Sequence, residues 1–230
     1  MKIGAVILSR MDSTRLPGKA LLEAGGRPLL CYVLAFCRKV DSIDTIALAT
    51  SDRLVDEPLS NFAKMNGITC IRGSLDNVAE RFLCAMEALN LDAAVRINGD
   101  SPLINPRLIS DCIQRFKEGS FDLVSNVPQR TYPYGMSVEV VGINAMRHAC
   151  ALMSDLKHRE HVTKYFYDNQ GKFNISIMTS GNPQFSEVQL SIDTREDFDR
   201  FVWIVDQLEG DPADSDIATL VDLAKAYPLV

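Results

Sequence analysis

The chain has little that would suggest a secreted, membrane-spanning or zinc-binding protein. Its six cysteines are scattered over 230 residues without a Cys-x-x-Cys pair, a pattern typical of reduced thiols and not of a disulfide framework or a zinc site. No apolar run approaches the roughly 18 residues of a membrane span, and no apolar stretch near the first residue leads to a cleavage site. These absences predict a cytoplasmic protein.

A surplus of basic residues is missing as well. The chain has 24 Lys and Arg against 30 Asp and Glu, a net charge of −6, whereas proteins that bind nucleic acids are normally basic. The composition, 47% hydrophobic and 23% charged, is that of an ordinary globular protein. We therefore expect no nucleic-acid partner. The net charge does not exclude binding of a single nucleotide, because that depends on the local charge of its site.

Two common phosphate-binding motifs are also absent. A Walker A loop needs Ser or Thr directly after its Gly-Lys, and here Lys19 is followed by Ala20. No Gly-x-Gly-x-x-Gly follows the first apolar run, Ile3 to Leu8, so the dinucleotide fingerprint is missing too.

One stretch nevertheless has the features of an anion site. It follows the apolar run at 3–8, which is long enough for a buried strand. It combines three cations, two hydroxyls and a glycine: Arg10, Ser13, Thr14, Arg15, Gly18 and Lys19. Hydroxyls and loop amides can bind phosphate oxygens beside the cations. This basic loop, residues 10–19, predicts a polyphosphate site, with a solvated surface loop as the alternative.

Strands and helices are expected to alternate along the chain. The expected strands are 3–8, 45–50, 68–71, 93–98, 121–125, 136–141, 173–178 and 188–192. The expected helices are 28–38, 58–66, 75–90, 106–118, 144–153, 159–169, 195–209 and 215–226. Short connections between such elements predict an α/β fold with a mostly parallel sheet, whose ligand lies beyond the carboxyl ends of the strands. The basic loop and Asp100 both follow expected strands.

The regular alternation of expected strands and helices ends at about residue 127, where a Pro- and aromatic-containing loop follows. No break in composition, low-complexity tract or internal repeat accompanies the change. We therefore expect residues 1–230 to form a single domain, with residues 127–185 as a small inserted lobe.

Six segments resemble a known family of enzymes. They are the basic loop and the segments 72–81, 96–102, 134–139, 159–163 and 191–197. Their sequences, including Arg-Ile-Asn-Gly-Asp-Ser-Pro at 96–102, are similar to those of the cytidylyltransferases that activate acidic sugars, the CMP-Kdo and CMP-sialate synthetases. The branch of spore coat polysaccharide biosynthesis protein F is the most similar. The resemblance implies a Rossmann-like, GT-A-like nucleotidyltransferase sheet flanked by helices.

The resemblance also implies an activity. A cytidylyltransferase of this kind couples CTP to a 2-keto-3-deoxy sugar acid, gives a CMP-sugar and pyrophosphate for surface polysaccharide or glycan synthesis, and uses Mg²⁺. Members are commonly homodimers, with the inserted lobe at the interface. Gly-Asp-Ser-Pro at 99–102 departs from the Gly-Asp-Glu-Pro type of the Kdo enzymes, which puts Kdo itself in doubt.

Three alternatives to this activity stay open. One is the same fold with another nucleoside triphosphate, or with a small phosphate or phosphonate acceptor. Another is a non-catalytic nucleotide-binding homologue. The third is a glycosyltransferase of related α/β architecture. Such an enzyme would normally show an Asp-x-Asp metal motif, whereas the segment at 99–102 supplies only one aspartate.

The resemblance assigns residues to the nucleotide and the metal. The nucleotide-binding residues that it implies are Leu8, Arg10, Ser13, Arg15, Lys19, Arg72, Ser74, Asn77 and Arg81. Arg10, Lys19 and Asp100 are implied to be catalytic, with Asp100 and Asp193 as ligands of Mg²⁺, which needs only one or two carboxylates.

Each assignment has a structural alternative. Asp100 has the turn-forming chemistry of any aspartate in a Gly-Asp-Ser-Pro segment, and Ser74 is a good helix N-cap. Arg81 fits an ordinary surface arginine. Thr194 and Asp197 form a variant of the capping box. Helix capping explains both residues but gives no role to the side chain of Asp193.

The acceptor side is implied to lie in the second half of the chain. Its candidate residues are Tyr134, Gly135, Glu139, Arg159, Glu160 and His161. The guanidinium fork of Arg159 suits the carboxylate of an acidic sugar. His158 and His161 fall on one expected helix face, but two histidines without further ligands are more typical of a structural pair than of a metal site.

Overall fold

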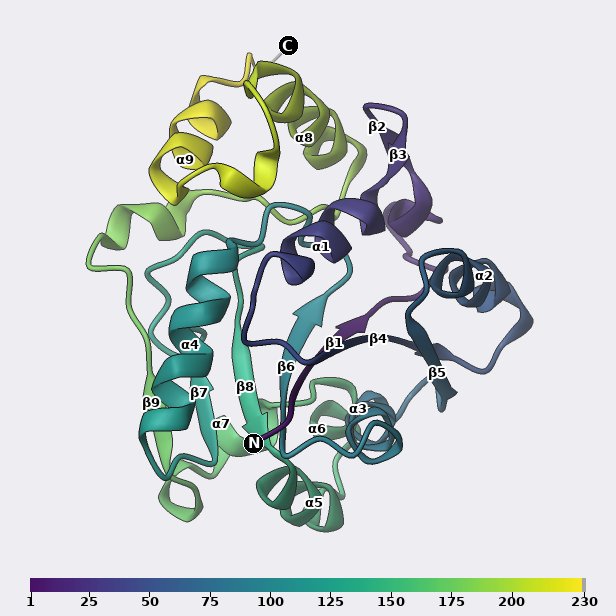
Figure 1. Cartoon of the computed structure of the whole chain (residues 1–230), viewed down its shortest axis with the longest axis vertical. Helices are drawn as coiled ribbons and strands as arrows, with labels where there is room; N and C mark the ends of the chain where they lie inside the picture. The colour runs from purple at the N-terminus through teal and green to yellow at the C-terminus, as the bar shows by residue number, and fades with distance from the viewer. Residues whose placement is uncertain (229–230) are drawn as a thin grey trace.

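A seven-stranded sheet forms the centre of the computed structural model, which describes residues 1–228 (Figure 1). The strand order is β5-β4-β1-β6-β8-β7-β9. The strands are β1 (Ile3–Leu8), β4 (Thr45–Ser51), β5 (Thr69–Gly73), β6 (Ala93–Asn98), β7 (Leu123–Ser125), β8 (Glu139–Gly142) and β9 (Ile175–Ile177). Neighbours are parallel except where β8 pairs antiparallel with β6 and β7. The mostly parallel sheet predicted from the alternation is confirmed.

Helices cover both faces of this sheet. The α-helices are α1 (Leu29–Arg38), α2 (Glu57–Met65), α3 (Val78–Ala88), α4 (Pro106–Glu118), α5 (Ile143–Leu152), α6 (Leu156–Glu160), α7 (Lys164–Asp168), α8 (Arg195–Gln207) and α9 (Ile217–Ala226). Short 3-10 helices are η1 (Lys19–Leu21), η2 (Leu54–Asp56), η3 (Gln170–Lys172), η4 (Pro183–Glu187) and η5 (Pro212–Asp214). A small hairpin, β2 (Glu23–Ala24) and β3 (Arg27–Pro28), precedes α1.

The strand side chains alternate between two hydrophobic cores. On β1, Ile3, Ala5 and Ile7 face a core shared with α1, α4, α8 and α9, while Val6 faces a core shared with α3, α5 and α7. Successive strand residues point to opposite faces, and helices on both faces make a strand apolar throughout. Figure 1 shows α1 and α4 in front of the sheet and α8 and α9 above it.

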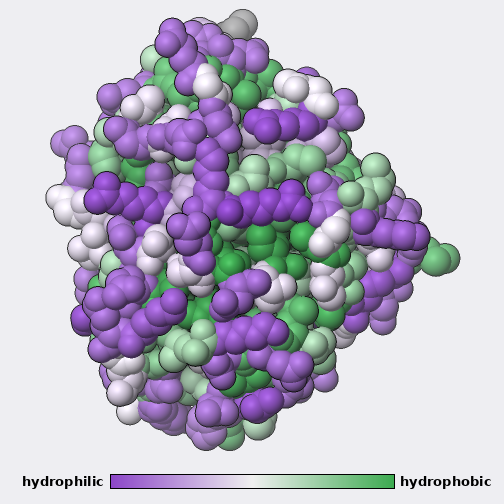
Figure 2. Space-filling view, viewed as in Figure 1, coloured by the Kyte–Doolittle hydropathy of each residue, from purple (hydrophilic) through white to green (hydrophobic). Residues whose placement is uncertain are grey.

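The surface is mostly polar on the face drawn in Figure 2, with hydrophobic residues visible mainly near the centre. Over residues 1–228, no helix combines the length and the apolar character that a bilayer crossing demands.

Two expected elements of the second half are wrong. The helix expected at 159–169 is two short helices, α6 and α7, because the chain leaves helical geometry at His161 (φ −106°, ψ 83°). The hydroxyl of Thr163 bonds Glu139 on β8 there. The strand expected at 188–192 makes only an isolated bridge between Tyr134 and Gln189. His158 and His161 therefore do not share a helix face.

Candidate active site

A cavity of about 420 Å³ lies beyond the carboxyl ends of β1 and β6. The two strands are parallel and pair Leu8 with Asn98, so the segments that follow them leave the sheet side by side. Gly99 makes this approach possible, because a Cβ at this position would lie 2.7 Å from Cβ of Ser9. The register thus brings the basic loop next to Asp100.

The predicted residues that line this first cavity are Leu8, Arg10, Ser13, Arg15, Lys19, Arg81, Asp100, Glu160, His161 and Asp193. They come from the end of β1, the basic loop, α3, the turn after β6, the end of α6 and the segment before α8. Residues far apart in the sequence therefore converge on one site.

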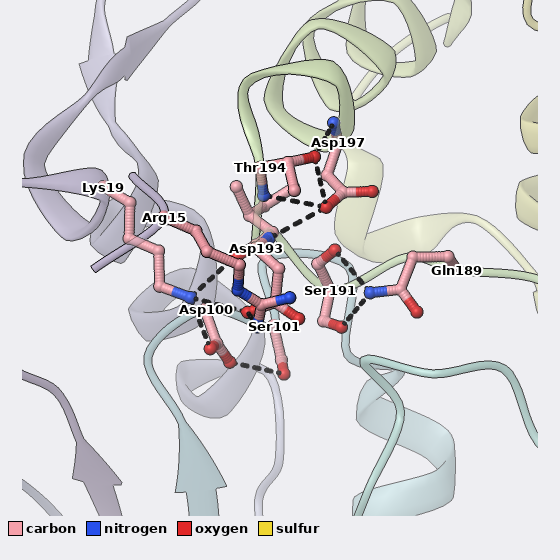
Figure 3. Close-up of polar contacts among 10 residues, drawn as sticks. Arg15, Lys19, Asp100, Ser101, Gln189, Ser191, Asp193, Thr194 and Asp197 are labelled. Carbon is pink, nitrogen blue, oxygen red and sulfur yellow. Dashed lines mark hydrogen bonds and ion pairs between the residues drawn. The ribbon is translucent and has the colours of Figure 1, made fainter. Parts of the chain in front are cut away.

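Lys19 is the centre of a charged cluster in this cavity (Figure 3). Its Nζ donates to Oδ2 of Asp100 at 2.8 Å, to Oδ1 of Asp193 at 3.2 Å and to the carbonyl oxygen of Ile192 at 2.5 Å. Arg15 Nη2 lies 2.9 Å from the same oxygen of Asp193. The side chain of Lys19 is only 12% exposed, whereas the side chain of Arg15 is 62% exposed, so the pairing of Lys19 with the two carboxylates is the more shielded from water.

The donor set of this cluster fits Mg²⁺ delivered with phosphates. Asp100 and Asp193 both reach one point, which the ammonium of Lys19 occupies. Magnesium prefers oxygen ligands and completes its shell with water and substrate phosphates, so two carboxylates suffice. In the described chain, no group of three or more His, Cys, Asp and Glu residues is suited to hold a metal ion. The arrangement therefore differs from a closed, all-protein metal site.

A capping box fixes the position of Asp193. Oδ2 of Asp197 accepts from the backbone N–H of Thr194 at 2.9 Å, and Oγ1 of Thr194 accepts from the N–H of Asp197 at 3.2 Å. The same carboxylate accepts from the N–H of Asp193 at 3.1 Å. The capping interpretation of Thr194 and Asp197 is confirmed, and it leaves the carboxylate of Asp193 directed towards Lys19 (Figure 3).

The segment before Asp193 is also held by the loop at 134–135. Tyr134 exchanges backbone hydrogen bonds with Val188 and Leu190 at 2.9 and 2.8 Å. Gly135 has φ +94°, and a Cβ there would lie 2.5 Å from the backbone nitrogen of Ser191. Only glycine fits this close contact between two backbones. Tyr134 and Gly135 therefore hold the segment that leads to Asp193 and do not line the first cavity.

Arg81 is a buried guanidinium at the wall of the first cavity. It is 4% exposed, and its Nη1 donates to the carbonyl oxygen of Ser74 at 2.5 Å. Its Nε is buried without a partner in the described chain. Burial lowers the pKa of Arg81 from its usual value, because desolvation disfavours the charged form. The alternative interpretation of Arg81 as an ordinary surface arginine is therefore wrong.

The other residues of that segment lie outside the first cavity. Arg72 donates to Oε2 of Glu57 at 2.5 Å and to the carbonyl oxygen of Arg53 at 2.9 Å. Asn77 is the N-cap of α3, since its side chain accepts from the N–H of Glu80 at 3.1 Å. Ser74 is not the cap, and its hydroxyl accepts from the N–H of Asn77 at 3.1 Å.

A second cavity of about 360 Å³ adjoins the first. Arg96, Asn98 and His161 line both cavities. Glu139 lines the second cavity and is 1% exposed. Its carboxylate forms an ion pair with Arg96 and accepts hydrogen bonds from the hydroxyls of Thr163 and Tyr167. Burial, reinforced by the Glu139 carboxylate, raises the pKa of Tyr167 far above its usual range.

The cations of the second cavity are not all the expected ones. Arg159 lines neither cavity, and its Nε donates to the carbonyl oxygen of Met153 at 3.4 Å. Arg130 and Lys164 line the second cavity instead. The guanidinium of Arg130 lies 4.4 Å from the ring centroid of Tyr134. The sequence signal for Arg130 was its place in the Pro- and aromatic-containing loop after β7.

The comparisons with known proteins agree with this architecture. The model of the cytidylyltransferase family matches residues 5–224. Spore coat polysaccharide biosynthesis protein SpsF of Bacillus subtilis is 30% identical, over 97% of this chain and 94% of its own length. A 3-deoxy-manno-octulosonate cytidylyltransferase of Pelobacter propionicus is 32% identical over 50% of this chain and 44% of its own length.

A solved structure covers nearly the whole fold. It is a cytidylyltransferase from Leptospira borgpetersenii with a TM-score of 0.92 and 27% identity, covering 98% of this chain and 94% of that one. The family model, the relatives and the fold agree, and the chain therefore belongs to the cytidylyltransferase family of nucleotidyltransferases.

Proposed function

We propose that the protein transfers the cytidylyl group of CTP to an acidic sugar of the 2-keto-3-deoxy type and releases pyrophosphate. The observation that carries the proposal is the pair of adjoining cavities. One holds the basic loop and two carboxylates, and the other holds further cations. A nucleotide in the first and an acceptor in the second would meet at Arg96, Asn98 and His161.

The nucleotide occupies the first cavity in this proposal. Arg10, Arg15 and Lys19 bind the phosphates, since cations preorganised in a partly buried site stabilise developing charge without reorganisation. Leu8, Ser13 and Arg81 border the nucleoside and the loop. Arg72, Ser74 and Asn77 then support the turn before α3 and have no direct contact with the ligand.

Asp100 and Asp193 would hold Mg²⁺, which supplies charge neutralisation of the triphosphate and a lower pKa for the attacking hydroxyl. The chain's own part is positional. The capping box and the contact at Gly135 fix Asp193, and backbone hydrogen bonds of the turn after β6 fix Asp100. Lys19 is free to pair with phosphate once it leaves the carboxylates. The hydroxyl then gives up its proton to solvent, its oxygen bonds the α-phosphorus, and the bond from the α-phosphorus to pyrophosphate breaks in line.

The acceptor occupies the second cavity. Arg130 and Lys164 bring positive charge to it, and a guanidinium binds a carboxylate through two oxygens. Glu139 has its oxygens engaged by Arg96, Thr163 and Tyr167, so its role in the proposal is to orient the cavity wall. Glu160 and His161 lie at the boundary with the nucleotide.

The proposal places the enzyme in the cytoplasm and in surface polysaccharide or glycan biosynthesis. Free cysteines throughout the described chain support a reducing compartment. A homodimer with the 127–185 lobe at its interface is part of the proposal, and the exposed Leu152 and Leu156 of that lobe are consistent with it.

Pyrophosphate release, measured with each of CTP, UTP, ATP and GTP and a panel of acidic sugars, tests the proposal. We expect release with CTP and at least one sugar acid, only when Mg²⁺ is present. A clear preference for UTP or GTP would contradict the cytidylyl assignment. Release of a nucleoside diphosphate would instead indicate a glycosyltransferase.

A second candidate keeps the fold and the nucleotide site but changes the acceptor. The two cations of the second cavity, Arg130 and Lys164, also suit a doubly charged phosphate or phosphonate. Including a sugar phosphate and a phosphonate in the same panel separates the two candidates, because each predicts turnover with a different anion.

A further inference from the structure

Asp56 is a fully buried carboxylate outside both cavities, at the end of η2 and directly before α2. Its position would suit an N-cap, yet its side chain forms no capping hydrogen bond to α2. A buried carboxylate needs strong partners to offset its desolvation. The partners of Asp56 lie instead on β4, directly before η2 and on the basic loop.

The backbone of Met11 is the main partner of Asp56. Its N–H donates to Oδ1 of Asp56 at 2.7 Å. The other carboxylate oxygen accepts from the hydroxyl of Ser51, the last residue of β4, and from Nη2 of Arg53 at 3.4 Å. Asp56 thus connects the start of the basic loop to the carboxyl end of a central strand.

Met11 also joins the two ends of the basic loop. Its carbonyl oxygen accepts from the N–H of Gly18 at 2.7 Å, and Gly18 has φ +72°, where glycine is favoured. The peptide groups on the two sides of Met11 therefore link Asp56, the loop start and the residue before Lys19.

The backbone of the basic loop has few other ties to the protein. Within residues 1–228, the bond from Met11 to Asp56 is the only hydrogen bond between the backbone of residues 10–18 and a group outside the loop and η1. A side-chain contact reinforces it, because Nη1 of Arg53 lies 2.6 Å from Oδ2 of Asp12. This contact lowers the pKa of Asp12.

We propose that Asp56 is a positioning residue for the nucleotide, which holds the basic loop in its phosphate-binding conformation through the backbone of Met11. The inference rests on the proposed binding of a nucleoside triphosphate to this loop. A loop that is ordered before binding loses less conformational entropy when the ligand binds. Arg10, Arg15 and Lys19 are then presented together without Asp56 touching the ligand.

Amide hydrogen exchange in the ligand-free wild-type protein tests the structural half of the proposal. We expect the amides of Met11 and Gly18 to exchange at least ~10-fold more slowly than those of Ser13 and Thr14, since an amide must lose its hydrogen bond before it exchanges. Exchange of Met11 as fast as that of Ser13 would overturn the proposal, whatever the substrate of the enzyme is.

Two substitutions of Asp56 test the functional half. In Asp56→Ala the Met11 amide has no acceptor, and we expect CTP with Mg²⁺ to bind about 10- to 100-fold more weakly. Asp56→Asn keeps one oxygen for Met11, so both its CTP affinity and its Met11 exchange rate should fall between those of wild type and Asp56→Ala. Binding is measured by calorimetry, and Tm verifies the fold.

Asp52→Ala is the matched control, because Asp52 is an exposed carboxylate on the same connection. It should leave CTP affinity and Met11 exchange unchanged. A folded Asp56→Ala protein with wild-type CTP affinity would overturn the proposal, and if that variant does not fold, the Asp56→Asn series decides by the same criterion. If the wild type bound no nucleoside triphosphate, the proposed function would fail, and the exchange rates would still decide whether Asp56 orders the loop.

Discussion

Lys19 places its ammonium 2.8 Å from the carboxylate of Asp100, inside the cavity proposed to hold the triphosphate. This ion pair, with Asp193 as its second acceptor at 3.2 Å, balances the charges of the ligand-free site. Mg²⁺ bound by the two carboxylates would displace the ammonium, and the ammonium would then be free to pair with phosphate. We therefore expect metal and nucleotide to bind together.

Substitution of Asp100 should stop the reaction without unfolding the protein. Asp100→Asn removes one proposed metal ligand and keeps the size of the side chain. We expect pyrophosphate release to fall by at least ~100-fold, in line with the loss of one preorganised electrostatic group, with Tm nearly unchanged. Asp206→Asn, on the exposed side of α8, is the control and should be fully active. Full activity of Asp100→Asn would remove the metal assignment.

Substitution of Lys19 should have opposite effects on the metal and on the nucleotide. In Lys19→Met the carboxylates of Asp100 and Asp193 lose their cation, so Mg²⁺ alone should bind more tightly than to wild type. CTP should bind more weakly, because one phosphate partner is gone. Calorimetry with each ligand measures both effects. Lys39 lines neither cavity, so Lys39→Met should leave CTP affinity unchanged. A parallel loss of both affinities in Lys19→Met would contradict competition for the carboxylates.

Two glycines with positive φ should respond differently to alanine. Gly181 has φ +74° and open space around it, so Gly181→Ala should cost only the strain of a left-handed residue, about 1–2 kcal/mol. Gly135→Ala adds a Cβ 2.5 Å from a backbone nitrogen, so its loss in free energy of unfolding should be clearly larger. Urea unfolding compares them, and equal losses would refute the close contact at Gly135.

Loss of the cap before α8 should lower stability moderately. Thr194→Ala removes the hydroxyl that accepts from the N–H of Asp197 and should cost about 1 kcal/mol. Tm should fall by roughly 2–4 °C for a domain of this size, and CTP affinity should fall too, because Asp193 loses its neighbour's support. Thr194→Ser retains the hydroxyl and should keep the stability and CTP affinity of the wild type. If it behaved like Thr194→Ala, the methyl group of Thr194, and not its hydroxyl, would be responsible for both effects.

Buried thiols should make the protein less stable at alkaline pH. Burial raises the pKa of Cys37, Cys112 and Cys150 to about 12, because a thiolate is poorly solvated in an apolar interior. These thiols make their full contribution to the free energy of unfolding below pH 9.0, the pKa of a thiol in the unfolded chain. The contribution is lost as the pH rises from there towards about 12. Urea unfolding at several pH values should therefore show falling stability above pH 9, with a smaller fall in Cys112→Ala.

Much of the fold could be predicted from local sequence patterns. Apolar runs bounded by turn residues identified the strands of the first half within a few residues, because those strands are buried on both faces and read as continuous hydrophobic segments. The helix expected at 159–169 was wrong, since its break depends on a hydrogen bond from Thr163 to Glu139, 24 residues away. A helical pattern carries no trace of such a distant partner.

The site was predictable to the extent that its residues follow strand ends. Lys19 and Asp100 come after two neighbouring parallel strands, β1 and β6, and meet in one cluster. Asp193 joins that cluster, although the segment before it makes only an isolated bridge. Arg130 was missed because its one sequence signal, a place in the Pro- and aromatic-containing loop, does not distinguish a cavity arginine from any other loop arginine. Arg159 was favoured by its charge, but its place on α6 directs it to the carbonyl oxygen of Met153.

The backbone pairing between Tyr134 and the 188–190 segment has a mechanical consequence. The connection that bears Arg130 and the one that bears Asp193 are bonded to each other on both sides of Tyr134, so we expect them to move as one rigid body. A hinge that opened the proposed acceptor cavity at this side would also withdraw a carboxylate from the proposed metal site. Departure of the product and dismantling of the catalytic cluster would then be a single motion.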